Sequence, residues 1–158
     1  METDSPISAP VEKMKFTLEL PINKPRAQVW KTFDNPQNMK EWQPSLISFE
    51  TISGTQGQPG AVSKLMFEEN GRQFELIEKV THRDEPSRLD GVYENNFADN
   101  MVRNTFIEKD KDQTLWVVET EFKFKTFLMR ILGPVMKKNF VARTQKDMER
   151  FKEMVESQ

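Results

Sequence analysis

The chain contains no cysteine and only one histidine. Without cysteine there can be no disulfide, no thiolate nucleophile and no thiolate metal site. A single imidazole is too few for the histidine ligand sets of catalytic zinc sites. We therefore expect neither a metal nor any other cofactor, and the missing cysteines fit a cytoplasmic protein.

Long apolar runs are also missing. No stretch approaches the roughly 18 consecutive apolar residues that indicate a membrane-spanning helix, so no stable membrane insertion is expected. The first residues, METDSPISAPVEK, are acidic and polar, unlike the basic and apolar regions of a signal peptide. We expect residues 1–12 to be a flexible segment that precedes a single domain at 13–158.

Neither sign of charge dominates. The 23 Lys and Arg residues are matched by 25 Asp and Glu, for a net charge of −2. Nucleic-acid-binding proteins normally carry a basic face, so no nucleic-acid partner is expected. The chain is expected to be a monomer or a weak dimer.

Large apolar side chains are what the chain has in quantity, with 12 Phe and 9 Met against one Tyr. Phe and Met supply bulky, adaptable apolar surface that makes no hydrogen-bonding demand. These residue types fit a packed core, and they fit the wall of an apolar cavity equally well.

The first regular segment alternates with a period of two. Met14, Phe16, Leu18 and Leu20 share one face, which predicts a half-buried strand that Pro21 ends. Two short helices are predicted next, one beginning at residue 23 or 24 and closing at 34–36, the other over 37–42.

Aromatic residues crowd these two helices, in the stretch VWKTFDNPQNMKEWQP. Val29, Trp30 and Phe33 lie on one side of the first helix and are predicted to be core. Trp42 lies just before Pro44 and is predicted to plug one end of the sheet. Two alternatives remain for it: that it touches a ligand, or that it only seals the end.

Six strand patterns follow, separated by turn signals, at 47–52, 62–69, 74–82, 89–95, 101–108 and 114–125. Asn70-Gly71 is a strong hairpin signal. Short links between consecutive strands predict an antiparallel meander. The glycines of GTQGQPG, residues 54–60, join two strands and do not form the loop of a dinucleotide site.

The C-terminal part is helical. A short apolar turn is predicted over 126–132, interrupted by Gly133-Pro134, and then a helix of about 34 Å over 134–156. An apolar stripe follows this helix: Met136, Phe140, Thr144, Met148, Phe151 and Val155. Its basic residues are predicted to form a solvated face, with contact to anionic lipid or nucleic acid as the alternative: Lys137, Lys138, Arg143, Lys146, Arg150 and Lys152.

This order of elements predicts an α+β fold. A curved antiparallel sheet of about seven strands needs a cover for its apolar face, and only the last helix is long enough. The two short helices between the first and second strands would plug one end. Such an arrangement leaves a pocket between sheet and helix, and pockets of this kind bind apolar ligands.

Side-chain alternation and the helix stripe give the predicted ligand-binding residues: Trp42, Phe67, Leu76, Glu78, Asn104, Phe106, Trp116, Val118, Thr120, Phe122, Met136, Phe140 and Thr144. Leu65 and Val80 are predicted to share the inward faces.

Glu78 and Asn104 are the weak candidates for catalysis. Glu78 shares a face with Leu76 and Val80, and a buried carboxylate would have a raised pKa and could serve as a general acid or base. The alternatives are that a bulge turns Glu78 outward, or that it pairs structurally with Arg103 or Arg88.

Two further polar residues have simple interpretations. Thr144, in the middle of the apolar stripe, either bonds back to a helix carbonyl or looks into a polar part of the cavity. His82 lies at a strand end and is predicted to be a solvated residue, with no partner for a catalytic triad.

The chain resembles a known superfamily, SRPBCC, whose members have the helix-grip fold. The resemblance covers residues 13 to 156. It rests on PINKPRAQVWKTFDNPQNMKEWQP, the GTQGQPGA link, EKVTHRDEPSRL and the C-terminal FLMRILGPVMKKNFVARTQKDMERFKEMVE. The bacterial polyketide-cyclase-like branch is the most similar, and START-type lipid-transfer and pollen-allergen-type binders belong to the same superfamily.

The leading hypothesis is a non-catalytic protein that binds or carries a hydrophobic small molecule, such as a lipid, isoprenoid or polyketide-like compound. Asn104, Thr120, Thr144 and Glu78 would orient it. Two alternatives remain: an enzyme of the cyclase or aromatase kind, and a protein-interaction module like the chaperone activators of the superfamily. A cavity would separate the first two from the third.

Overall fold

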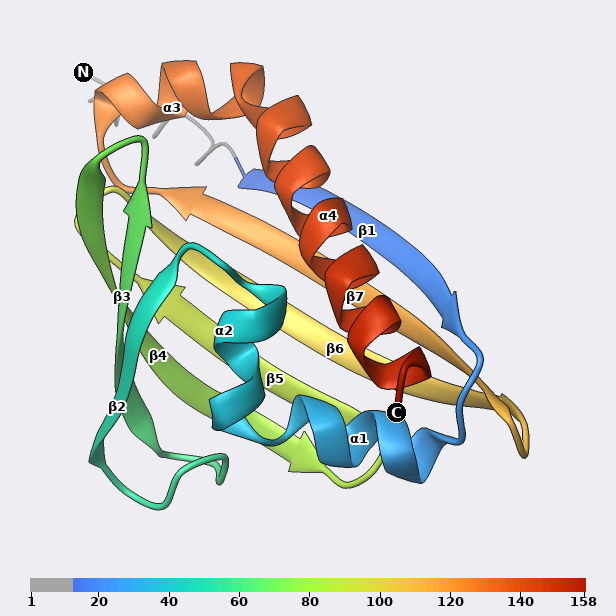
Figure 1. Cartoon of the computed structure of the whole chain (residues 1–158). Coiled ribbons are helices and arrows are strands. Elements are labelled where there is room, and N and C mark those ends of the chain that lie inside the picture. Colours follow the sequence, from blue (N-terminus) through green and yellow to red (C-terminus); the bar gives the residue numbers. More distant parts are fainter. Residues whose placement is uncertain (1–12) are drawn as a thin grey trace, which may run out of the picture.

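A computed structural model of the chain describes residues 13–158 (Figure 1); the predicted flexible segment 1–12 lies outside them. The elements in chain order are β1 (Lys13–Ile22), α1 (Arg26–Phe33), η1 (Pro36–Asn38), α2 (Met39–Trp42), β2 (Leu46–Ser53), β3 (Val62–Glu69), β4 (Arg72–Asp84), β5 (Arg88–Glu94), β6 (Ala98–Asp110), β7 (Gln113–Phe124), α3 (Phe127–Val135) and α4 (Lys137–Glu156). Across the described range, no helix has both the length and the apolar character needed to cross a membrane.

The seven strands form one antiparallel sheet in the order β1-β7-β6-β5-β4-β3-β2. Strands β2 to β7 each pair with their neighbour in the chain, and β1 closes the order by pairing with β7. The prediction of an α+β fold with a curved antiparallel meander is therefore confirmed. Figure 1 shows α4 lying across the concave face, with α1 and α2 at one end.

The strand borders follow from local chemistry. Asn70 and Gly71, with φ of 52° and 75°, supply the positive dihedrals of a type I′ hairpin turn, as predicted. Pro21, in contrast, does not end β1, which continues to Ile22. Because β1 is an edge strand, a proline is tolerated there.

Five aromatic rings pack together between the sheet and the C-terminal half of α4. Phe33, Trp42, Phe106, Trp116 and Phe151 lie with ring centroids 5.0 to 5.9 Å apart. They come from α1, α2, β6, β7 and α4. This group, called the aromatic cluster below, joins the helices to the sheet at one end of the molecule.

An ion pair fastens the end of α1 to the sheet. Arg83 on β4 donates two hydrogen bonds of 2.7 Å to the Asp34 carboxylate and a third, of 3.2 Å, to the Gly57 carbonyl. The guanidinium also lies 5.1 Å from the centre of the Trp30 ring. A bidentate Arg–carboxylate pair of this geometry is stronger than an ordinary surface pair, so it holds α1 in place.

The helices at the C-terminus correct the prediction for Gly133-Pro134. These residues do not interrupt the first helix but lie inside α3, and the break comes at Met136. Gly133 explains why α3 continues. It is the buried residue of α3 and lies so close to Phe124 that a Cβ there would be 2.2 Å from the ring, so α3 rests on Phe124 through a glycine.

Replacing this glycine tests the contact. Gly133→Ala should lower the free energy of unfolding by about 1–3 kcal/mol, because the added methyl group overpacks the site. Chemical denaturation measures the change. Phe124→Leu, which shortens the opposing side chain, should make the Gly133→Ala substitution less costly in the double variant than in the wild type. Additive effects would contradict the contact.

Candidate functional site

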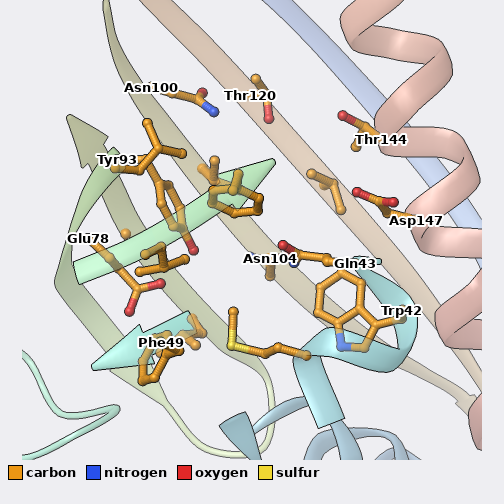
Figure 2. A pocket seen from close by; sticks show the side chains of 18 of the residues that line it. Trp42, Gln43, Phe49, Glu78, Tyr93, Asn100, Asn104, Thr120, Thr144 and Asp147 are labelled. Atoms are coloured by element: carbon orange, nitrogen blue, oxygen red, sulfur yellow. The ribbon is translucent and has the colours of Figure 1, made fainter. Parts of the chain in front are cut away.

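A cavity of about 330 Å³ lies between the concave face of the sheet and α4. The aromatic cluster bounds one end through Phe33, Trp42 and Trp116. Phe122 of β7 and Phe140 of α4 bound another part of the wall, stacked with their ring centroids 4.8 Å apart. Figure 2 shows that both the sheet and α4 contribute polar side chains to the wall of this cavity.

Most of the predicted ligand-binding residues line this cavity. Those that do are Trp42, Phe67, Leu76, Glu78, Asn104, Trp116, Val118, Thr120, Phe122, Phe140 and Thr144. Leu65 and Val80, predicted to share the inward faces, line it too. Period-two alternation and the helix stripe therefore predicted residues that line one cavity, while their contact with a ligand stays a prediction.

Two predicted residues lie elsewhere. Phe106 points inward as expected but is buried in the aromatic cluster, 5.0 Å from Phe33 and 5.9 Å from Trp30 between ring centroids. Met136 lies at the break between α3 and α4 and is exposed. The prediction failed for Met136 because the long helix begins only after it.

Trp42 closes the end of the sheet and also reaches the cavity, so its contact with a ligand stays a prediction. It is buried and packs 5.4 Å from Phe151 between ring centroids, which seals the end of the sheet. Part of the same side chain lines the cavity. Its indole Nε1–H is buried and has no hydrogen-bond acceptor within residues 13–158.

Glu78 faces the cavity from β4. The bulge on this strand comes later, between Val80 and His82, so Glu78 is not turned outward. Neither predicted arginine pairs with it, because Arg88 and Arg103 both bind Asp90. Burial raises the pKa of the Glu78 carboxyl, and a hydrogen bond from Tyr93 partly offsets this.

Asn104 and Thr144 each make a side-chain hydrogen bond to another residue of the protein. The Asn104 side-chain oxygen accepts a hydrogen bond of 3.1 Å from the Trp116 indole N–H. The Thr144 hydroxyl donates to the Phe140 carbonyl at 2.9 Å, as one of the two interpretations expected, while the side chain also lines the cavity. Asn104 thereby positions Trp116, which weakens its case as a proton-transfer group.

His82 is exposed on β4, as predicted for a solvated residue. Within residues 13–158, no three acidic, histidine or cysteine side chains gather closely enough to hold a metal ion.

Sequence reasoning missed a polar row across the floor of the cavity. The sheet register places Glu78 opposite Tyr93, Tyr93 opposite Asn100, and Asn100 opposite Phe122. Tyr93 and Asn100 both line the cavity, and the Asn100 side-chain oxygen is buried without a partner within the described range. Alternation along 89–95 could have identified Tyr93, whose face had not been assigned.

A second missed group lies on α4. Asp147 and Arg143 line the cavity, and Arg143 forms a 2.6 Å ion pair with Glu69 at the end of β3. Burial raises the pKa of Asp147 to about 6, although Arg150 and Arg143 favour its ionised form. The apolar stripe pattern omitted both residues because it ranks charged positions as solvent-facing.

Comparison with known proteins identifies a family. A family model described as polyketide cyclase / dehydrase and lipid transport matches residues 13–156. No curated protein matches the chain.

Solved structures share the fold at low sequence identity. One is Ara h 8.0201, with a TM-score of 0.76 and 19% identity over 93% of this chain and all of that chain. A START superfamily protein from Mycobacterium smegmatis has a TM-score of 0.75 and 15% identity, covering 90% and 97% of the two chains. The Zhui aromatase/cyclase from Streptomyces sp. R1128 has a TM-score of 0.74 and 12% identity, covering 92% and 94%.

The carboxyl group of Asp147 should make stability depend on pH. Its pKa rises from 3.8 to about 6 on folding, so the folded state holds the extra proton between these values. Its contribution is therefore most favourable below pH 4 and is lost as the pH rises through 6. We expect the free energy of unfolding to fall by about 1–2 kcal/mol as the pH rises through this range, because solvent around the partly exposed side chain weakens the effect.

Asp147→Asn removes this dependence. The variant should gain about 1–2 kcal/mol in free energy of unfolding, relative to wild type, between pH 4 and pH 7, measured by denaturation at both pH values. Asp112→Asn, at an exposed turn position, controls for removal of one negative charge. An equal change for Asp147→Asn at both pH values would show that Asp147 titrates normally.

Proposed function

The chain belongs to the polyketide cyclase / dehydrase and lipid transport family, within the SRPBCC superfamily, and we propose that it binds a hydrophobic small molecule. The cavity between the sheet and α4 is the observation on which the proposal depends. A void of about 330 Å³ costs stability when it is empty. Its persistence beneath a long helix is explained if a ligand fills it.

The size of the cavity limits the ligand. It lies at the lower end of the ~300–1,000 Å³ typical of small-molecule sites. Such a volume suits a compact isoprenoid or an aromatic, polyketide-like molecule better than a two-chain phospholipid. The aromatic walls provided by Trp42, Trp116, Phe122 and Phe140 favour a flat apolar body, since rings stack well on rings.

Polar groups at two places would select the ligand's orientation. Tyr93 and Asn100 lie on the sheet side, and Thr144 and Asp147 on α4 (Figure 2). Apolar burial would supply the affinity, at roughly 25 cal/mol per Å² before ordering costs. The Asn100 oxygen and the Trp42 N–H have no hydrogen-bond partner among residues 13–158. A ligand that offers one donor and one acceptor to them would therefore bind more tightly.

Glu78 supports a second candidate function, an enzyme that moves a proton on the bound molecule. Burial raises the pKa of the Glu78 carboxyl, which lies beside the Tyr93 hydroxyl, and a carboxyl of this kind can act as a general acid or base. An aromatase/cyclase is among the proteins of similar fold. Binding alone is the simpler proposal, because it needs no reaction and depends only on the cavity.

The third alternative, a protein-interaction module, is disfavoured by the cavity. That alternative expects a filled core together with an exposed apolar patch. The molecule has such a patch on α3, but the space under α4 is not filled.

Filling the cavity tests the binding proposal. Titration with oleic acid, farnesol and naringenin, which represent the three ligand classes, should change the fluorescence of Trp42 and Trp116 for at least one compound. Thr144→Phe should weaken that binding at least tenfold, because the new ring occupies the cavity. Ala142→Phe places the same ring on the exposed side of α4 and should bind as wild type. Unchanged binding by Thr144→Phe would place the ligand elsewhere.

Glu78→Gln separates the binder from the enzyme. The amide mimics the protonated carboxyl that burial favours, so affinity for a neutral ligand should change by less than about threefold. Incubation with an aromatic ligand, followed by mass spectrometry, shows whether wild type converts it. Conversion by the wild type that is lost in Glu78→Gln would establish the enzyme instead of the carrier, and conversion that survives would remove Glu78 from the reaction.

A further inference from the structure

Helix α3 presents most of its apolar side chains to solvent. The exposed fractions are 77% for Phe127, 63% for Leu128, 54% for Ile131 and 78% for Val135. Leu132 and Met136 are exposed as well. Single exposed apolar residues are common on protein surfaces, whereas a contiguous group of them marks a contact surface.

The way α3 is held explains this exposure. Gly133 is the buried residue of α3 and lies on the Phe124 ring of the sheet, and Thr126 caps the first turn of the helix by accepting a hydrogen bond from the Met129 N–H. A glycine contact lets the helix backbone approach the sheet but covers little apolar surface. In Figure 1, α3 lies at the end of the molecule away from α1.

A further apolar residue lies beside the start of α3. Phe97, in the turn between β5 and β6, is 57% exposed. Its carbonyl accepts a hydrogen bond of 2.8 Å from the Lys125 N–H, so the turn is fixed next to the first residues of α3. The apolar surface therefore extends from α3 onto the adjacent end of the sheet.

The same part of the chain is basic. No Asp or Glu occurs from 122 to 146, a stretch with seven Lys and Arg residues, although the whole chain has 25 acidic residues. Lys125 pairs with Asp99 and Arg143 with Glu69. Arg130, Lys137 and Lys138, on and directly after α3, have no acidic partner within 4.0 Å among residues 13–158.

We propose that α3 and the first turn of α4 form a docking surface for an anionic lipid bilayer. A helix that lies in the plane of the membrane interface binds through two features, exposed apolar residues and flanking Lys and Arg residues. The apolar side chains of α3 enter the boundary between headgroups and acyl chains. The three basic residues bind lipid phosphates, and their attraction to an anionic leaflet adds to the apolar contact.

Charge favours this occupant over a second copy of the chain. A symmetric dimer through α3 would bring the same patch on two molecules face to face. Arg130, Lys137 and Lys138 of both molecules would then lie close together, and like charges oppose such a contact. An anionic bilayer presents the complementary sign over an extended surface.

Docking would also bring the cavity close to the bilayer. Phe140 and Arg143 line the cavity and follow Lys137 and Lys138 within two turns of α4. The inference rests on α3 and the first turn of α4 and does not depend on the proposed cavity ligand.

Vesicle sedimentation tests the proposal. The full chain should sediment at least tenfold more strongly with vesicles of equal parts phosphatidylcholine and phosphatidylglycerol than with phosphatidylcholine alone. Because surface charges are screened by ions, added salt should reduce the bound fraction. Equal binding to both vesicle types, or none to either, would overturn the proposal.

A matched pair of variants identifies the surface. Ile131→Glu on α3 should lower the bound fraction at least fivefold, whereas Ile52→Glu on β2, where the exposed fraction is also 54%, should leave it unchanged. Lys137→Gln with Lys138→Gln should remove the preference for the anionic vesicles. Circular dichroism checks that each variant is folded.

Two outcomes would contradict the assignment. Equal losses for Ile131→Glu and Ile52→Glu would show that vesicle binding is not specific to α3. A dimer in analytical ultracentrifugation that dissociates in Ile131→Glu, without vesicle binding by the wild type, would show that a second copy covers the patch.

Discussion

One long helix must cover the concave face of a seven-stranded sheet, and a tightly packed group of aromatic rings joins the two only at the C-terminal half of that helix. Phe151 joins Phe33, Trp42, Phe106 and Trp116 in a tightly packed cluster, beside Met148 and Val155. Toward its N-terminus α4 supplies Phe140, which stacks on Phe122, and the polar side chains of Thr144 and Asp147, and all of these line the cavity. The space between them and the sheet stays open.

Burial in the cavity wall changes the pKa of two carboxyl groups. Glu78 and Asp147 both lie in that wall, and burial raises the pKa of each carboxyl. Such groups cost stability in an apolar surrounding, and the proposed function gives them a role in orienting a ligand. The proposed bilayer contact follows from the way α3 packs, because the helix buries Gly133 against Phe124 and leaves most of its apolar residues exposed.

Much of the fold and most of the cavity wall followed from the sequence, because period-two alternation determines which strand residues share a face. The pattern failed where a local signal competed with tertiary contacts. Pro21 looks like a strand terminus but lies on an edge strand, and Gly133-Pro134 looks like a helix break although Phe124 requires a glycine there. Tyr93 was missed because no inward face was assigned to the strand at 89–95, and Asp147 because the apolar stripe of the last helix leaves out charged positions.

The most direct test of the account is the mass of the folded protein. Native mass spectrometry of protein purified without detergent should show a species heavier than the denatured chain by the mass of one small molecule, retained in the wild type and absent from a variant whose cavity is filled at Thr144. A folded wild-type protein with only the mass of its own chain, which also takes up no apolar compound on incubation, would contradict the central claim that the space beneath α4 is a ligand site.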